Sequence, residues 1–128
     1  MKYLIFMLFL SLPKYGVAQE APSKTSETSN SFIGNWKIDL RPTPDSDEYF
    51  QYFVVKTINK NAFNGTFYSS EITNGILNNN WPELYFAFST TDQSNEYYHS
   101  GYLKDGKLYG ITYCPKRGFT APSTGIKE

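Results

Sequence analysis

The chain has 128 residues, with 12 basic and 12 acidic side chains, so its formal net charge at neutral pH is zero. This balance provides neither the basic surface that binds nucleic acid nor the polybasic patch that binds anionic lipid. Aromatic residues are abundant, with 11 Tyr, 10 Phe and 2 Trp. Because aromatic side chains favour half-buried pleated surfaces, this composition predicts an all-β protein.

The first 18 residues have the pattern of a cleavable export signal. Lys2 precedes an apolar run from Leu4 to Leu12, and Gly16-Val17-Ala18 has the small-x-small pattern of a cleavage site that ends at Ala18. The apolar run is far shorter than the ~20 residues of a spanning helix, so we expect no stable membrane insertion after cleavage. We therefore predict a signal peptide over 1–18 and an exported protein, either secreted or periplasmic. Without Lys2 and Lys14, ten basic residues face twelve acidic ones, a net charge of −2.

Residues 19–31 are rich in Ser, Thr, Glu, Lys and Pro without periodicity, which predicts a flexible leader. From Phe32 the period becomes two, and a first strand over 32–40 turns Gly34, Trp36, Ile38 and Leu40 to one face. The expected β-domain spans 32–121. Because Pro122 should limit a last strand that starts at Phe119, residues 122–128 are expected to form a tail.

Further strands are expected at 49–58, 63–69, around 76–77 and 81–90, separated by turn-forming segments. No segment has a sustained 3.6-residue apolar period, so no helix is expected to contribute to the fold. Alternation predicts several inward side chains: Phe53, Val55, Phe63, Gly65, Phe67, Leu84, Phe86 and Phe88.

The last hairpin allows a prediction of register. Lys104-Asp105-Gly106-Lys107 is a two-residue turn signal, and counting outward from it pairs Leu103 with Leu108 and Gly101 with Gly110. His99, Thr112, Tyr97 and Cys114 then share the inner face. Tyr98, Tyr102, Tyr109 and Tyr113 share the outer face with both lysines, because the turn lysines require solvent.

Gly34-Asn35-Trp36 on a first strand, the meander of short strands and the late basic segment Lys116-Arg117-Gly118-Phe119 resemble the calycin group, above all lipocalin-like barrels. The Gly-x-Leu pattern of Gly101-Tyr102-Leu103 is similar to avidin-like members. The resemblance implies a small antiparallel up-and-down β-barrel of about seven or eight strands. It also implies that Trp36 closes one barrel end and that Arg117 packs over Trp36. It implies a fold more than a function.

Two opposed inward glycines leave space beneath them, so Gly101 and Gly110 suggest an interior pocket, although side chains can also fill an eight-stranded barrel. An apolar pocket with a few polar groups is typical of a small-ligand site. We therefore hypothesise a non-enzymatic protein that binds a small apolar ligand. The candidate ligand-binding residues are Trp36, Phe53, Phe67, Phe86, Phe88, His99 and Thr112.

An alternative function uses the outer surface, where the four outward tyrosines and the Arg41–Glu48 loop would bind a protein or a glycan. Catalysis is not expected, because His99 and Cys114 lack an orienting third group and oxyanion donors. The scattered carboxylates neither support nor exclude a glycosidase-type pair. Cys114 is the only cysteine, so no internal disulfide forms. We expect no metal and no cofactor, since Asp45, Asp47 and Glu48 lack the spacing of a calcium loop.

Overall fold

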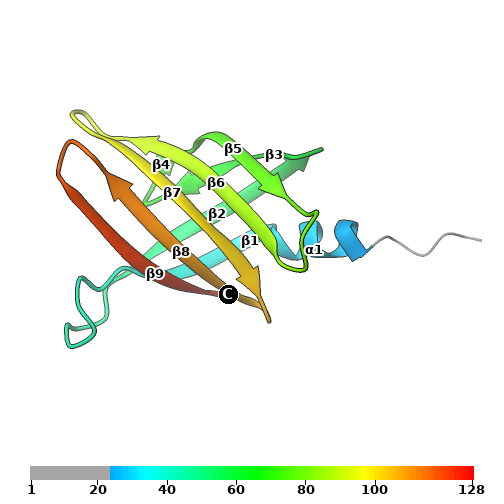
Figure 1. The fold of residues 1–128 in the computed structure, drawn as a ribbon, viewed down its shortest axis with the longest axis horizontal. Coiled ribbons are helices and arrows are strands. Elements are labelled where there is room, and N and C mark those ends of the chain that lie inside the picture. Colours follow the sequence, from blue (N-terminus) through cyan, green and yellow to red (C-terminus); the bar gives the residue numbers. More distant parts are fainter. Residues whose placement is uncertain (1–23) are drawn as a thin grey trace, which may run out of the picture.

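A computed structural model describes residues 24–128 as one closed antiparallel β-barrel (Figure 1). Eight strands follow one another around the barrel, and a ninth short strand, β4, pairs antiparallel with the end of β3. The strands are β1 (Gly34–Asp39), β2 (Phe50–Asn59), β3 (Ala62–Phe67), β4 (Ser70–Glu71), β5 (Thr73–Asn78), β6 (Leu84–Thr91), β7 (Glu96–Lys104), β8 (Lys107–Cys114) and β9 (Phe119–Lys127).

Consecutive barrel strands are neighbours, and the pairing of β1 with β9 closes the ring. Closure gives each of the eight strands two hydrogen-bonded neighbours, so the barrel has no free strand edge along its paired segments. The prediction of an all-β, antiparallel up-and-down barrel of seven to eight strands is confirmed. The signal peptide predicted over 1–18 and residues 19–23 of the predicted leader lie outside the described residues.

The N-terminal part of the domain differs from its prediction. Residues 24–32 form a helix, α1 (Lys24–Phe32), and β1 begins at Gly34 instead of Phe32. A helix of this length has too few turns to give a sustained apolar period, so the pattern along the sequence did not reveal it. Phe32, which we expected in the first strand, is the last residue of α1. No helix within 24–128 is long and apolar enough to span a membrane.

The predicted tail is a second difference. β9 continues through Pro122 to Lys127, and residues 124–127 pair with β1. Pro122 lies opposite Ile111 of β8, whereas β1 pairs with β9 only from Asp39–Thr124 onward. Pro122 is therefore beyond the end of β1, on a stretch with one neighbouring strand, where a missing N–H costs no β1–β9 hydrogen bond.

The register of the last hairpin is confirmed from Lys104–Lys107 to Tyr98–Tyr113. The expected bend at Gly65 is also present, since the β2–β3 register shifts between Val55 and Thr57, opposite Gly65 and Asn64. The β6 strand starts at Leu84, because Trp81, Pro82 and Glu83 belong to the preceding loop.

One aromatic core fills the barrel. The inward side chains predicted from alternation are buried, and Phe53 and Val55 are each 1% exposed. Phenylalanine rings from β2, β3 and β6 contact one another, as in the stacked Phe53–Phe88 pair with centroids 4.9 Å apart. The core consists of Phe32, Trp36, Ile38, Phe53, Val55, Phe63, Phe67, Ile72, Leu77, Leu84, Phe86, Phe88, Leu103 and Leu108.

Candidate functional site

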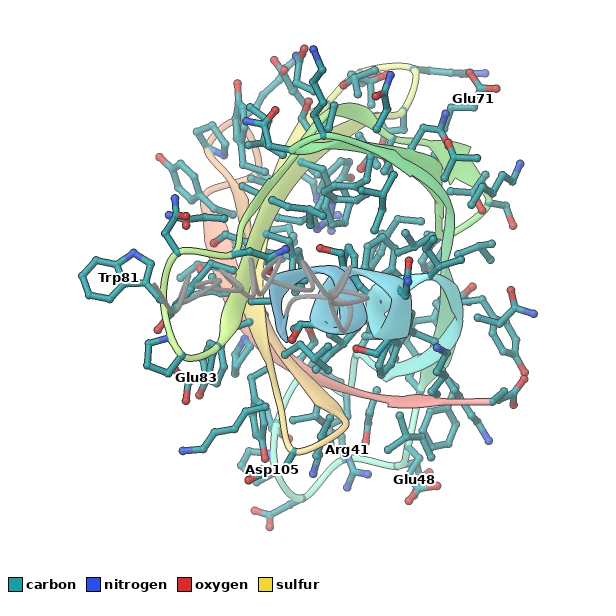
Figure 2. The ribbon with its side chains drawn as sticks, turned by 90° about the vertical axis from the view of Figure 1, so that its right-hand side faces the viewer. Arg41, Glu48, Glu71, Trp81, Glu83 and Asp105 are labelled. Carbon is teal, nitrogen blue, oxygen red and sulfur yellow. The ribbon has the colours of Figure 1, made fainter. Side chains whose placement is uncertain are left out.

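The two ends of the barrel are built differently. At one end α1 lies across the ring of strands, as the view along the barrel shows (Figure 2). At the other end the β1–β2 loop and the β6–β7 and β8–β9 turns surround an opening. We call these the closed end and the open end. A hollow of about 740 Å³ also lies at the closed end, outside the barrel bore, between α1 and the β2–β3 and β5–β6 loops.

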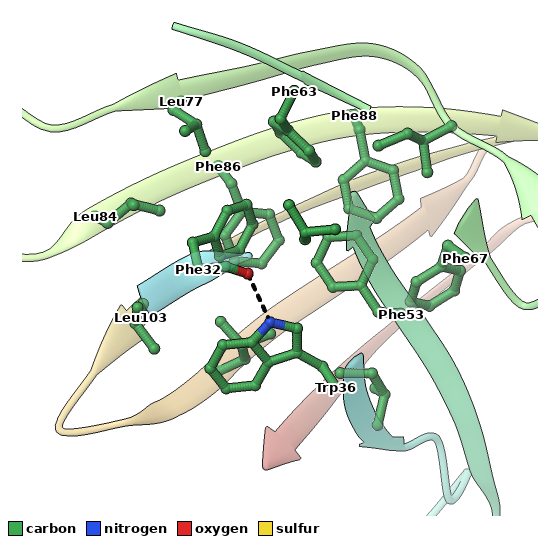
Figure 3. Close-up of a cluster of buried hydrophobic side chains, with 14 residues drawn as sticks. Phe32, Trp36, Phe53, Phe63, Phe67, Leu77, Leu84, Phe86, Phe88 and Leu103 are labelled. Carbon is green, nitrogen blue, oxygen red and sulfur yellow. Dashed lines mark hydrogen bonds between the residues drawn. The ribbon is translucent and has the colours of Figure 1, made fainter. Parts of the chain in front are cut away.

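Phe32 seals the closed end. Its ring is fully buried and contacts Phe53, Phe63 and Phe86, with centroids 5.2–5.8 Å away. The indole Nε1 of Trp36 donates a hydrogen bond of 2.9 Å to the Phe32 carbonyl, which otherwise would be an unpaired helix-terminal acceptor (Figure 3). One aromatic residue therefore plugs the barrel, and a second aromatic residue holds it in place.

Trp36 lies at the closed end, as the resemblance implied, but Arg117 does not cover it. The cation over the Trp36 ring is Lys127, with Nζ 5.6 Å from the ring centroid. Lys127 Nζ also donates to the Ser31 carbonyl at 2.8 Å, which caps the C-terminus of α1. Arg117 precedes β9 at the open end, whereas Lys127 ends β9 at the closed end, so the prediction for Arg117 is wrong.

The backbone conformation at Gly34 explains why the Gly34-Asn35-Trp36 motif begins with glycine. Its φ is +139°, in a region that side-chain-bearing residues rarely adopt, and an added Cβ would lie 2.7 Å from Cε of Lys127. Glycine therefore allows the chain to turn from α1 into β1 and allows Lys127 to approach the helix end.

The pocket expected beneath Gly101 and Gly110 is absent. A Cβ on Gly101 would lie 2.9 Å from Cζ of Phe86 and 2.2 Å from the Tyr109 carbonyl oxygen, so Phe86 already occupies that space. The remaining internal void beside Phe86 and Gly110 measures about 20 Å³, about the volume of one water-sized probe. The barrel centre is a filled core, the second possibility that the sequence left open.

A larger cavity lies at the open end. Its volume is about 590 Å³, within the range of small-molecule sites. The walls combine six apolar side chains with three tyrosines and seven polar or charged side chains. The lining residues are Leu40, Pro42, Tyr49, Phe67, Tyr68, Ser70, Thr90, Thr91, Asp92, Tyr97, His99, Thr112, Arg117, Phe119, Ala121 and Pro122.

His99 forms the floor of this cavity. Its Nε2 is 2.9 Å from Thr90 Oγ1 and its Nδ1 is 2.9 Å from Thr112 Oγ1, while its ring stacks on Phe88. Burial lowers the pKa of His99 to about 4, so the imidazole is neutral at pH 7. In a neutral imidazole one nitrogen donates and the other accepts, so the two hydroxyls take opposite roles.

Three polar side chains form a chain along the rim. Arg117 Nη1 donates to Tyr97 Oη at 3.1 Å, and Tyr97 Oη donates to Asp92 Oδ2 at 2.8 Å. Hydrogen bonds from the Ser94 backbone, Tyr97 and the Asn95 backbone hold the pKa of Asp92 at about 2. Asp92 is therefore ionised and fixes the Tyr97 ring, while the Arg117 guanidinium lies over Phe119, 4.9 Å from its centroid.

The turn between β3 and β4 forms another part of the cavity wall. Tyr68 and Ser69 connect β3 to β4 with φ values of +53° and +64°, at positions that normally favour Gly or Asn. The hydroxyls of Tyr68 and Tyr49 share a hydrogen bond, which raises the pKa of Tyr68. Lys60, Asn74 and Asp105 adopt the same left-handed conformation in other turns, so the conformation belongs to the tight turns of this barrel.

The structure separates the candidate ligand-binding residues into two groups. Phe67, His99 and Thr112 line the open-end cavity, whereas Trp36, Phe53, Phe86 and Phe88 belong to the core. Sequence reasoning missed Thr90, Asp92, Tyr49 and Tyr68. Asp92 begins the turn before β7, and its position in a turn was the only signal of its place on the rim.

The other groups considered from the sequence lie apart from this cavity. Cys114 is fully buried and no hydrogen bond joins it to His99. Within residues 24–128, no group of three or more His, Cys, Asp or Glu side chains is placed to hold a metal ion. Arg41 forms ion pairs with Asp39 at 2.5 Å and with Glu48 at 3.4 Å. These pairs connect the two ends of the predicted Arg41–Glu48 interaction loop to each other and to the end of β1.

The class of protein defined by this architecture is a small antiparallel β-barrel, closed by a helix at one end and hollowed at the other, consistent with a calycin-like fold. Comparisons with models of protein families, with curated proteins and with solved structures found no match to this chain.

Proposed function

We propose that this protein is an exported, non-enzymatic barrel that binds a small, largely apolar molecule at its open end. The observation that carries the proposal is the 590 Å³ cavity, whose lining joins apolar side chains with a polar rim and has a neutral His99 on its floor. A ligand of this kind buries its apolar body against Leu40, Phe67 and Phe119. The export part of the proposal rests on the signal pattern of residues 1–18.

The filled barrel centre restricts the ligand to the mouth. Because Phe86 and Phe53 occupy the interior, the ligand reaches no deeper than His99. Rigid walls favour affinity, since Tyr97 is held between Arg117 and Asp92 and loses little rotamer freedom on binding. A kinship with lipocalin-like proteins belongs to the same proposal and is supported by Gly34 and Trp36 at the closed end.

The absence of catalysis is also part of this proposal. Both ring nitrogens of His99 are engaged by threonine hydroxyls, so its lone pair is not aimed at a ligand in this geometry. Within residues 24–128, the hydrogen-bond partners of the imidazole are Thr90 and Thr112 and not a carboxylate of the kind that orients a catalytic histidine. The site therefore supplies shape and polarity rather than an activated nucleophile.

A direct test is fluorescence titration with 1-aminoanthracene, a neutral apolar probe, together with native mass spectrometry of protein purified from its own host. Ala121 is half-buried in the cavity wall, so Ala121→Trp should fill the cavity and abolish the increase in probe fluorescence. The matched control is Ala87→Trp on the outer surface of β6, which should leave probe binding unchanged. Equal binding by both variants, or no binding by the original protein, would show the proposal to be wrong.

A further inference from the structure

Exposed aromatic and aliphatic side chains gather on the outer surface of β5 to β8. Tyr85, Tyr98 and Tyr113 are 42%, 44% and 53% exposed, and Ile76 and Ile111 project beside them. Single exposed apolar side chains are ordinary, but a contiguous group on one face marks a binding surface. This surface is distinct from the open-end cavity, because its side chains point away from the barrel interior.

Strand register arranges these side chains in rows. Ile76 pairs with Ala87, Ala87 with Ser100 and Ser100 with Ile111, which makes one row across four strands. Two residues away on the same face, Tyr85, Tyr102 and Tyr109 form a second row. Two residues away on the other side, Tyr98 pairs with Tyr113. The small side chains of Ala87 and Ser100 thus lie between two rows of tyrosines.

The row of small residues forms the floor of a groove. One half, of about 530 Å³, extends beside Tyr85 and Tyr102, and the other half, of about 440 Å³, extends beside Tyr98 and Tyr113. The halves share Ala87, Ser100 and Ile111, so they form one continuous groove. Tyr98 and Tyr102 are four residues apart on β7, which separates the walls by ~14 Å.

The tyrosine walls are preorganised. Tyr102 stacks on Tyr109 with centroids 5.1 Å apart and an interplanar angle of 17°, and Tyr85 lies 5.8 Å from Tyr102. Tyr98 and Tyr113 lie 6.3 Å apart. Because neighbouring rings restrict one another and tyrosine has few rotatable bonds, little conformational entropy is lost when a ligand binds.

The chemistry of the groove selects a neutral, hydroxyl-rich ligand. None of the residues that line the larger half is charged, and the smaller half contains one carboxylate, Glu96, which is hydrogen-bonded to Tyr98. The floor strands β6, β7 and β8 each pair on both sides, so their ladders leave no strand edge for an added peptide strand. Recognition therefore depends on aromatic faces and on hydroxyls that both donate and accept. We propose that this groove binds a neutral carbohydrate chain, with its C–H faces against the tyrosine rings and its hydroxyls bonded to Ser100 and the tyrosine hydroxyls.

The test is isothermal titration calorimetry with three neutral oligosaccharides, cellotetraose, chitotetraose and maltotetraose, each at millimolar concentration. We expect at least one to bind. Tyr102→Ala removes a stacking ring and should weaken that binding about tenfold, as expected for an aromatic contact of ~1.4 kcal/mol. Ser100→Phe fills the groove from an exposed position and should abolish binding.

Tyr52→Ala is the matched control. Tyr52 is 47% exposed on β2, a strand not adjacent to β6, β7 or β8, so its removal should leave oligosaccharide binding unchanged. Ala121→Trp, which fills the open-end cavity, should also leave it unchanged, so this test is independent of the proposed function. The inference is overturned if none of the three sugars binds or if Ser100→Phe binds as well as the original protein. Capture of a protein partner through this groove without sugar binding would also overturn it.

Discussion

Aromatic residues line both the closed end and the open end of this barrel, but they are buried at the closed end and partly exposed at the open end. At the closed end, Phe32 and Trp36 are buried and the one polar atom of the indole is paired with the helix-terminal carbonyl. At the open end, Tyr97 and Tyr68 are partly or largely exposed, and their hydroxyls bond to neighbours on the rim. Aromatic side chains seal one end and leave the other hollow.

The difference arises from what covers each end. At the closed end α1 provides a ring that fits the barrel bore, and Lys127 anchors the helix terminus to β9. At the open end, within residues 24–128, loops surround the opening, and residues 41–48, 92–95 and 115–118 of these loops are exposed or half-buried. The helix that leads directly into β1 therefore determines at which end the bore of the barrel is filled.

The largest expected effect comes from removing the plug. Phe32→Ala should destabilise the protein by about 3–5 kcal/mol, because it leaves a cavity in the core and weakens the attachment of α1. Urea unfolding followed by tryptophan fluorescence measures this loss. Phe119→Ala, at the half-buried rim of the open end, is the control and should cost much less. Similar losses for both variants would contradict the distinction between the two ends.

The next effect is the pH dependence of stability from His99. Its pKa falls from 6.5 in the unfolded chain to about 4 in the folded protein, so between these values the unfolded state binds more protons. Stability from the neutral imidazole is therefore complete above pH 6.5 and is lost as pH falls toward 4, by roughly 3 kcal/mol in total. Unfolding measured from pH 7 to pH 4 checks this slope.

The control for this pH effect is His99→Gln, which retains hydrogen-bonding groups near Thr90 and Thr112 but does not titrate. Its stability should change less between pH 6.5 and pH 4 than that of the original protein. An unchanged slope in this variant would assign the pH dependence to other groups.

A smaller effect is expected at the turn between β3 and β4 at the open end. Ser69 has a φ of +64°, and replacing it with glycine relieves the steric cost of that conformation. Ser69→Gly should stabilise the protein by about 0.5–1 kcal/mol, with the unfolded-state entropy of glycine offsetting part of the gain. At Gly106, with a φ of +74°, Gly106→Ala should have the opposite sign. Thermal unfolding of both variants measures the two shifts.

An effect of similar size distinguishes the two basic residues. Lys127→Met removes the cation over Trp36 and should cost about 0.5–1 kcal/mol while changing the emission of Trp36. Arg117→Met should leave the Trp36 emission unchanged, because Arg117 lies over Phe119 at the open end. A change in that emission in Arg117→Met alone would reverse the assignment.

Much of the barrel could be predicted because strand patterns and tight turns are local. The Asp105-Gly106 turn sets the β7–β8 register, so alternation assigned Leu103 and Leu108 to the interior and Tyr102 and Tyr109 to the exterior. Contacts between side chains that meet only when the first and last strands close the barrel could not be predicted from local patterns. The partner of Trp36 comes from β9, more than 80 residues later, and a motif resemblance selected Arg117 where the structure has Lys127.

The candidate site was predicted only in part for the same reason. His99 and Thr112 were assigned to one inner face, and both line the cavity. Their depth along the barrel, and thus whether they face a pocket or the packed core, depends on strand tilt and on the side chains of distant strands. Phe86 fills the space that two glycines suggested was empty, and its position follows from β6–β7 pairing rather than from the glycines.

By itself the sequence determined the strand periodicity, the inward and outward faces and the register of the last hairpin, because these follow from period-two alternation and turn chemistry. The tertiary structure alone decided which end is closed and where a cavity remains. Both depend on how α1, β1 and β9 meet, and such contacts between distant segments leave no local pattern. The Gly34-Asn35-Trp36 motif was visible in the sequence. Its contact with Lys127 depends on the pairing of β1 with β9, which no local pattern predicts.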